Sequence, residues 1–120
     1  MSGVSLDQTE QGAVSAVVGR LREALGDQLL AIRLYGSRAR GETPGPDSDV
    51  DLLVIIRDGD WRRQREVAHL AWEAVDSAGA NEGRFSVFVH DPKWLRERRE
   101  IRSFFIQEVD RDKVVLYGNA

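Results

Sequence analysis

Two aspartates, Asp49 and Asp51, stand two residues apart at the start of the apolar run Val50–Ile56. Side chains alternate across a β-strand, so both carboxylates would point to one face, with their Cα atoms about 6–7 Å apart. Mg²⁺ prefers oxygen ligands and takes one or two carboxylates together with waters and substrate phosphates. The spacing of the two aspartates therefore predicts a candidate cation site.

A glycine–serine pair, Gly36 and Ser37, precedes the aspartates and is separated from them by a polar loop. Glycine permits a close backbone approach, amides at a helix start bind phosphate oxygens, and the Ser37 hydroxyl adds a donor. Arg38 and Arg40 follow at once and would neutralise charge on a polyphosphate leaving group. Together with the aspartates, the pattern predicts an in-line phosphoryl or nucleotidyl transfer supported by a metal ion.

Each of these features also has an ordinary structural explanation when it is taken alone. An Asp-x-Asp pair often consists of surface aspartates at a strand start, and a Gly-Ser pair is usually a turn. The conjunction of strand, Gly-Ser turn, loop, acidic pair and second apolar strand favours a functional site. The reason is that two carboxylates beside a buried strand are costly unless something compensates their charge.

The composition narrows the class of protein. The chain has 120 residues, of which 42% are hydrophobic and 31% charged, and we expect one soluble α/β domain over residues 1–120. It has no cysteine, which excludes disulfides, thiolate metal sites and cysteine nucleophiles. A net charge of -3 gives no electrostatic reason to expect DNA or a membrane surface as partner. No apolar run approaches the ~18 residues of a membrane span, so a cytoplasmic protein is expected.

The elements that would position the site follow from the periodicity of the apolar residues. Positions with helical spacing predict helices over residues 9–25 and 60–78 and a third from residue 91, with Asp7 and Glu10 as a capping pair. Ile101, Phe105 and Val109 predict one or two further helical turns. Short apolar runs predict strands at 29–35, 50–56, 85–90 and 113–117.

Three further groups are better explained by structure than by chemistry. His90 ends a predicted strand, and the basic run from Arg96 to Arg102 is expected to be a solvated helix face. Trp61, Trp72 and Trp94 are expected to be packing anchors, although one or two of them could belong to a partner interface.

The segment YGSRARGETPGPDSDVDLLVI resembles the signature of the nucleotidyltransferase superfamily related to DNA polymerase β, and is closest to its minimal (MNT-type) members. In that family the motif is Gly-Ser, a loop, and then Asp-x-Asp followed by apolar residues. The C-terminal segment FFIQEVDRDKVVLYG is similar to the ending common in these short proteins.

The resemblance implies a small mixed β-sheet flanked by helices, like the palm of polymerase β, and ATP or another NTP bound through Mg²⁺. By this likeness Gly36 and Ser37 would hold the triphosphate, and Asp49 and Asp51 would ligate the metal. The reaction would transfer a nucleoside monophosphate, most often AMP, to a hydroxyl. The resemblance also implies a HEPN-domain protein as partner, in which a tyrosine receives AMP from the antitoxin.

One departure from the family pattern separates two hypotheses. Complete members carry a third carboxylate on a following strand, where it serves as metal ligand and base, and Ser86 stands at the best-aligned position here. The chain is then an active transferase with two carboxylates, or a non-catalytic module that neutralises a HEPN-type partner by forming a complex. Transfer to a small molecule is less favoured, because such relatives usually carry an extra helical domain. The acceptor, the base preference and the oligomeric state stay open.

Overall fold

The computed structural model describes residues 4–45 and 49–118. The chain begins with a long helix and ends with a short strand, and two 3-10 turns, 26–28 and 82–84, precede β1 and β3. The regular elements are α1 (Gln8–Leu25), β1 (Leu29–Tyr35), β2 (Val50–Ile56), α2 (Trp61–Ser77), β3 (Phe85–His90), α3 (Pro92–Glu100), α4 (Phe104–Asp112) and β4 (Val114–Gly118).

The four strands form one mixed sheet in the order β3-β2-β1-β4. The β1 strand pairs antiparallel with β2 and with β4, whereas β2 and β3 run parallel. A parallel pair needs a crossover connection, and α2 supplies it between β2 and β3. The two central strands are accordingly buried along almost their whole length.

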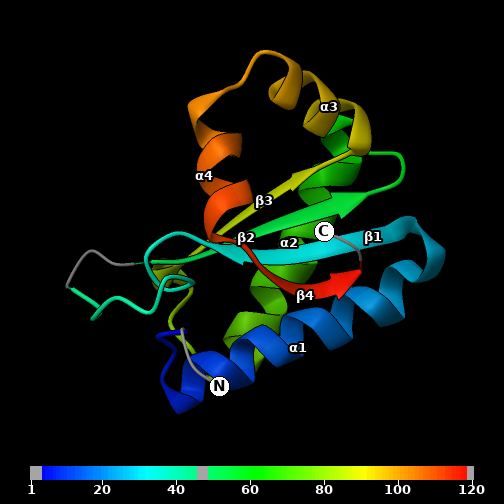
Figure 1. Ribbon diagram of the computed structural model, residues 1–120. Helices are drawn as coiled ribbons and strands as arrows, with labels where there is room; N and C mark the ends of the chain where they lie inside the picture. Colours follow the sequence, from blue (N-terminus) through cyan, green and yellow to red (C-terminus); the bar gives the residue numbers. More distant parts are fainter. Residues whose placement is uncertain (1–3, 46–48, 119–120) are drawn as a thin grey trace.

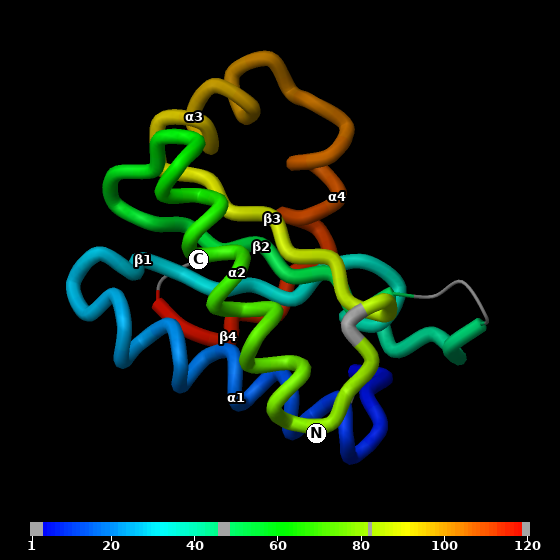
Figure 2. The backbone as a smooth tube through the Cα atoms, turned by 180° about the vertical axis from the view of Figure 1, so that it is seen from behind, coloured from blue at the N-terminus to red at the C-terminus, as the bar shows by residue number. Residues whose placement is uncertain are grey.

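The two faces of the sheet are covered unequally. A large core lies between the sheet and helices α1 and α2, whose buried side chains include Val17, Leu21, Val67 and Val75. A smaller core on the other face joins the sheet to α3 and α4 through Leu95, Ile106 and Val109. In Figure 1 α2 lies behind the sheet, and Figure 2 shows it in front. The mixed sheet flanked by helices that was expected is therefore confirmed.

Local signals account for the element ends. Asp7 and Glu10 form a complete capping box, in which the Glu10 amide donates to Asp7 Oδ1 at 2.7 Å and the Asp7 amide donates to Glu10 Oε1 at 3.0 Å. Asp60 and Asp91 cap α2 and α3 in the same way from the N-terminal side. The strands predicted at 29–35, 50–56 and 85–90 have the bounds expected from sequence.

The arginine-rich helix ends earlier than the apolar spacing suggested. The helical conformation ends after α3. Arg102, in the following turn, has a φ of 51°, the one positive value among the described residues other than glycine. Ser103 then caps a separate helix, α4, by accepting a hydrogen bond from the Ile106 amide. Ile101 consequently lies at the turn, where 65% of its surface is exposed.

The expectation for the tryptophans is wrong at one position. Trp61 begins α2 and is 64% exposed, with the Arg62 and Arg65 guanidinium groups over its ring. Trp94 packs as expected and stacks on His90 with ring centroids 3.7 Å apart. Over the stretches of chain described here, no helix combines the length and the apolar character that crossing a membrane would require.

Candidate functional site

The two aspartates lie on the face of the sheet that α3 and α4 cover. Asp51 is the second residue of β2, and Asp49 precedes the strand by one residue. Alternation along β2 puts both on the side of Leu53 and Ile55, which belong to the smaller core. The sheet brings Tyr35 of β1 opposite Asp51 from one side, and Ser86 of β3 from the other.

Gly36 lies against the Asp51 carboxylate. A β-carbon built on Gly36 would stand 2.5 Å from Asp51 Oδ2, which is closer than real contacts allow. The φ of Gly36 is 80°, in the region that other residues rarely adopt. Both the backbone conformation and the nearness of the Asp51 side chain therefore favour glycine at this position.

The carboxylate of Asp51 is in an environment that disfavours its charge. Partial burial and then the negative charge of Asp49 raise its pKa to about 6, although Arg38 acts in the opposite direction. Burial and the charges of Asp51 and Glu108 raise the pKa of the Tyr35 phenol as well. A cation between the two aspartates would remove this electrostatic cost.

Ser86 of β3 lies beside the two aspartates as the register partner of Asp51. Its Oγ donates to Asp49 Oδ2 at 3.5 Å, a long hydrogen bond. Within residues 4–45 and 49–118, no group of three or more histidine or acidic side chains gathers closely enough to hold a metal ion. The protein thus offers two carboxylates and a hydroxyl at this point.

The segment after Gly36 forms a tight turn. The amides of Arg40, Gly41 and Glu42 donate to the carbonyls of Gly36, Arg38 and Ser37 at 3.1–3.2 Å. These bonds fold residues 36–42 back on themselves beside the aspartates. The end of the following loop, residues 46–48, lies outside the described residues.

Arg38 is directed into the protein and away from solvent. Its side chain is 1% exposed, and its Nη1 donates to Glu10 Oε1 at 2.6 Å and to the Ser5 carbonyl at 3.0 Å. The hydrogen bond to Glu10 is the main cause of a raised Arg38 pKa, to which Asp49 also contributes by its charge. Arg38 therefore ties the turn to the start of α1.

Arg40 is the more accessible of the two arginines. Its guanidinium pairs with Glu42 at 2.7 Å and with Asp112, the last residue of α4, at 2.5 Å. These carboxylates raise the pKa of Arg40. The structure thus brings Gly36, Asp49 and Asp51 together, while Arg38 and Arg40 flank the turn in ion pairs.

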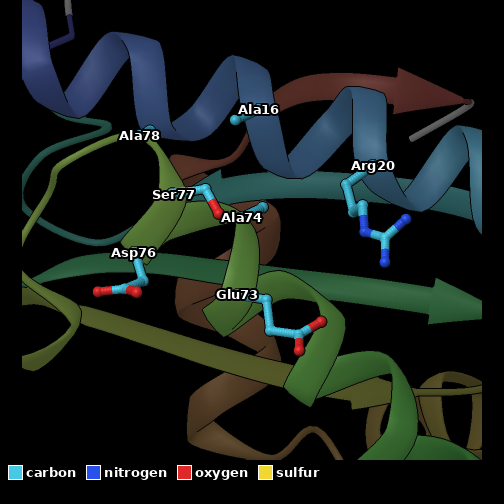
Figure 3. A pocket seen from close by; sticks show the side chains of 7 residues that line it. All are labelled: Ala16, Arg20, Glu73, Ala74, Asp76, Ser77 and Ala78. Atoms are coloured by element: carbon cyan, nitrogen blue, oxygen red, sulfur yellow. The ribbon is translucent and has the colours of Figure 1, made fainter.

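Of two hollows in the surface, one lies beside the turn that follows Gly36 and the other lies far from the aspartates. One, of about 360 Å³, lies beside the turn and is lined by Ser5, Leu6, Asp7, Glu10, Arg38, Pro44 and Arg84. The other, of about 630 Å³, lies between α1 and α2. Figure 3 shows the side chains of Arg20 from α1 and of Glu73 and Asp76 from α2, which line this hollow. This second hollow is on the opposite face of the sheet from the aspartates, so it is no part of the site.

Sequence reasoning missed three residues that shape the site. Tyr35 adjoins Asp51 only because β1 and β2 pair in this register. Glu10 and Asp112 hold the two arginines from positions 28 and 72 residues away in the chain. For Glu10 a signal existed, since Glu10 is the acidic member of a capping box, but its second role comes from tertiary contact.

A family model described as a nucleotidyltransferase domain matches residues 15–117. No curated protein gives a match.

Several solved structures share the fold. One is a chain of a toxin–antitoxin complex with AMP-PNP, with 22% identity and a TM-score of 0.57 over 88% of this chain and 73% of that chain. Another comes from a mutant of the toxin–antitoxin MntA–HpeT, with 24% identity and a TM-score of 0.54 over 88% and 72%. A third is a spectinomycin adenyltransferase from Enterococcus faecialis with ATP and spectinomycin, with 17% identity and a TM-score of 0.56. The match covers 90% of this chain but only 56% of that enzyme.

Proposed function

Because the chain belongs to the nucleotidyltransferase domain family, we propose that it is a Mg²⁺-dependent enzyme that transfers AMP from ATP to a hydroxyl of a protein partner. In this proposal the partner is a HEPN-domain toxin and the chain is its antitoxin. The structural likeness to chains of toxin–antitoxin complexes, one of them with AMP-PNP, supports this choice of partner and nucleotide.

The observation that carries the proposal is the contact between Gly36 and the Asp51 carboxylate. It puts a glycine turn, suited to phosphate, directly against an acidic pair, suited to a cation. Burial, and then the charge of Asp49, raise the pKa of Asp51, so a cation bound here would stabilise its ionised form. In a nucleoside triphosphate with its divalent cation, the phosphates would bind to the turn and the cation would bind to the acidic pair.

The donors present fit Mg²⁺. Its octahedral shell is usually filled by one or two carboxylates, with waters and phosphate oxygens in the other positions, so Asp49 and Asp51 suffice as protein ligands. Bound there, the ion would polarise the phosphoryl oxygens and neutralise the developing charge. The Ser86 hydroxyl lies close enough to hold Asp49 in place.

The residues of the turn have separate roles in this proposal. Gly36 and Ser37 hold the triphosphate, since the backbone there can approach phosphate closely. Arg40, at the surface, neutralises the pyrophosphate as it leaves. Arg38 is a positioning residue, because its guanidinium is held by Glu10 and fixes the turn on α1.

The transfer itself is an in-line displacement. The acceptor oxygen bonds to the α-phosphorus, the bond from that phosphorus to the pyrophosphate oxygen breaks, and the hydroxyl proton leaves to a base or to water. Positioning and charge neutralisation, and not covalent chemistry by the protein, lower the barrier.

The test is label transfer from α-labelled ATP to a co-expressed HEPN-domain partner. Asp49→Asn and Asp51→Asn are expected to lower transfer at least ~100-fold, since each removes a charged ligand. Asp58→Asn, in the exposed turn after β2, is the matched control and should transfer normally. Undiminished transfer by both site variants would refute the proposal.

A second candidate function rests on Ser86. With a hydroxyl at the position beside Asp51, the chain would be a non-catalytic module that neutralises its partner by binding alone. In that case Asp49→Asn would still neutralise the toxin in a growth assay. Loss of neutralisation by Asp49→Asn with the complex intact would instead support the transferase.

A further inference from the structure

Three large apolar side chains are exposed on and beside the face of the sheet that carries the aspartates. Phe88 of β3 is 46% exposed, and Ile101 and Phe104, at the turn between α3 and α4, are 65% and 83% exposed. Phe88 lies two residues after Ser86 on the same face of its strand, so it continues the line of the site along β3. We call Phe88, Ile101 and Phe104 the apolar rim.

The rim is connected to the site through α4. The Phe105 ring meets Tyr35 edge-on, with centroids 5.4 Å apart, and meets Phe88 at 5.8 Å. At its other end, α4 is tied by Asp112 to Arg40 in the turn after β1. Figure 1 shows α4 standing over the end of the sheet where β1 ends and β2 begins. The rim is thus linked to Asp51 through Phe105 and through Tyr35, the register partner of Asp51.

The charges around the rim identify the chemistry of the occupant. Residues 92–102 contain five cationic side chains and two carboxylates, which makes this segment positive in a chain whose net charge is -3. Arg96 and Arg102 are exposed there, whereas Arg99 is paired with Asp110 of α4 at 2.7 Å. Such a surface attracts an acidic partner, and a second copy of this chain would bring like charge against like.

We propose that the apolar rim, with Arg96 and Arg102 beside it, docks the protein acceptor. The contacting segment of the acceptor carries apolar side chains flanked by carboxylates, and it presents its hydroxyl toward Asp49 and Asp51. This inference rests on the proposed function for the identity of the reaction, but binding at the rim is measurable without any transfer. Burial of exposed aromatic side chains supplies the affinity, and the arginines set orientation and association rate.

The experiment measures binding of the full chain to the HEPN-domain partner named in the proposed function. The double variant Ile101→Ala/Phe104→Ala should bind at least ~30-fold more weakly, as expected for central apolar anchors. Trp61→Ala removes an equally exposed aromatic side chain on α2 and should bind within about 2-fold of wild type. Binding of a fluorescent ATP analogue should be equal in all three proteins.

Charge reversal gives a second, independent measurement. Arg96→Glu should weaken binding about 10-fold at low salt and make it less sensitive to added salt. Arg62→Glu, on α2, is the matched control and should leave both quantities unchanged. Since Arg96 and Phe104 are exposed, these variants are expected to fold normally.

Several results would overturn the inference. The inference is wrong if the rim variants bind the partner as tightly as the wild type, or if Trp61→Ala weakens binding equally. It is also wrong if the wild-type chain does not bind the partner, or if a rim variant turns a dimer of this chain into a monomer. The last result would make the rim an interface between two copies. Intact binding at the rim together with transfer that survives in Asp49→Asn would instead contradict only the proposed transferase.

Discussion

The Oδ2 atom of Asp51 lies 2.5 Å from the point where a β-carbon on Gly36 would stand. A side chain at position 36 would therefore have to displace the Asp51 carboxylate. This contact puts the turn at Gly36 directly beside the acidic pair, as the proposed chemistry requires.

Gly36→Ala should therefore reduce the rate of transfer far more than it reduces the stability of the protein. The new methyl group must displace the Asp51 carboxylate, and we expect activity to fall at least ~100-fold. The positive φ adds a cost of about 1–2 kcal/mol to folding. Gly79→Ala is the control, because Gly79 has a φ of 82° and nothing within 4 Å of the added carbon. Thermal unfolding should be similar for the two variants, and a similar loss of activity in both would contradict the role given to the contact.

The stability of the metal-free protein should depend on pH through Asp51. Its pKa is raised from 3.8 to about 6 on folding, so the folded state holds the proton more tightly and loses stability as the pH rises through 6. The Asp51→Asn variant lacks this penalty. Its advantage in unfolding free energy over wild type should grow by about 1 kcal/mol between pH 5 and pH 7.5, after allowance for the partial exposure of the group.

The measurement is chemical denaturation in EDTA at the two pH values. Asp58→Asn serves as control and should change little relative to wild type. Added Mg²⁺ should raise the stability of wild type at pH 7.5 and leave Asp51→Asn nearly unaffected. An advantage of Asp51→Asn that does not grow with pH would contradict the assigned environment of the carboxylate.

Removal of the charge on Glu10 should cost more stability than removal of any exposed ion pair nearby. Glu10→Gln keeps a capping side chain but leaves the buried Arg38 guanidinium with a neutral neighbour. We expect a loss of about 2–4 kcal/mol in the free energy of unfolding. Glu42→Gln, which breaks an exposed pair with Arg40, should change the free energy of unfolding much less. Equal effects in urea denaturation would show that Arg38 does not depend on Glu10.

A carboxylate at position 86 should strengthen the site. Ser86 is the register partner of Asp51 and lies within 3.5 Å of Asp49, so Ser86→Asp brings a third acidic group to the same point. We expect a lower Mg²⁺ requirement and transfer at least ~10-fold faster, together with reduced stability in EDTA. The control is Gln8→Asp, which adds the same charge at an exposed position of α1. A Ser86→Asp variant with unchanged metal dependence would show that this position does not face the metal.

Much of the fold could be predicted because its signals are local. The apolar runs 29–35, 50–56 and 85–90 are short and bounded by turn residues, and each is a strand with those bounds. The capping pair Asp7 and Glu10 likewise requires only residues three apart. Where a pattern is complete within one helix or strand, the sequence alone is sufficient to predict that element.

The errors have the opposite character. The spacing of Ile101, Phe105 and Val109 fits a helical stripe, but spacing carries no information about the positive φ of Arg102 that ends α3. The burial of Arg38 beside Glu10 depends on where the turn meets α1, which no local pattern records. Charged residues near a phosphate motif can hold the motif together as readily as they can contact the phosphate.

The edge-on contact between Phe105 and Tyr35 has a thermodynamic consequence. Tyr35 is the register partner of Asp51, so a shift of α4 that moves Phe105 also changes the surroundings of the acidic pair. If the nucleotide and the acceptor each favour the same position of α4, the binding of one increases the affinity for the other. Linkage makes this help reciprocal: whatever factor the nucleotide adds to the affinity for the acceptor, the acceptor adds to the affinity for the nucleotide.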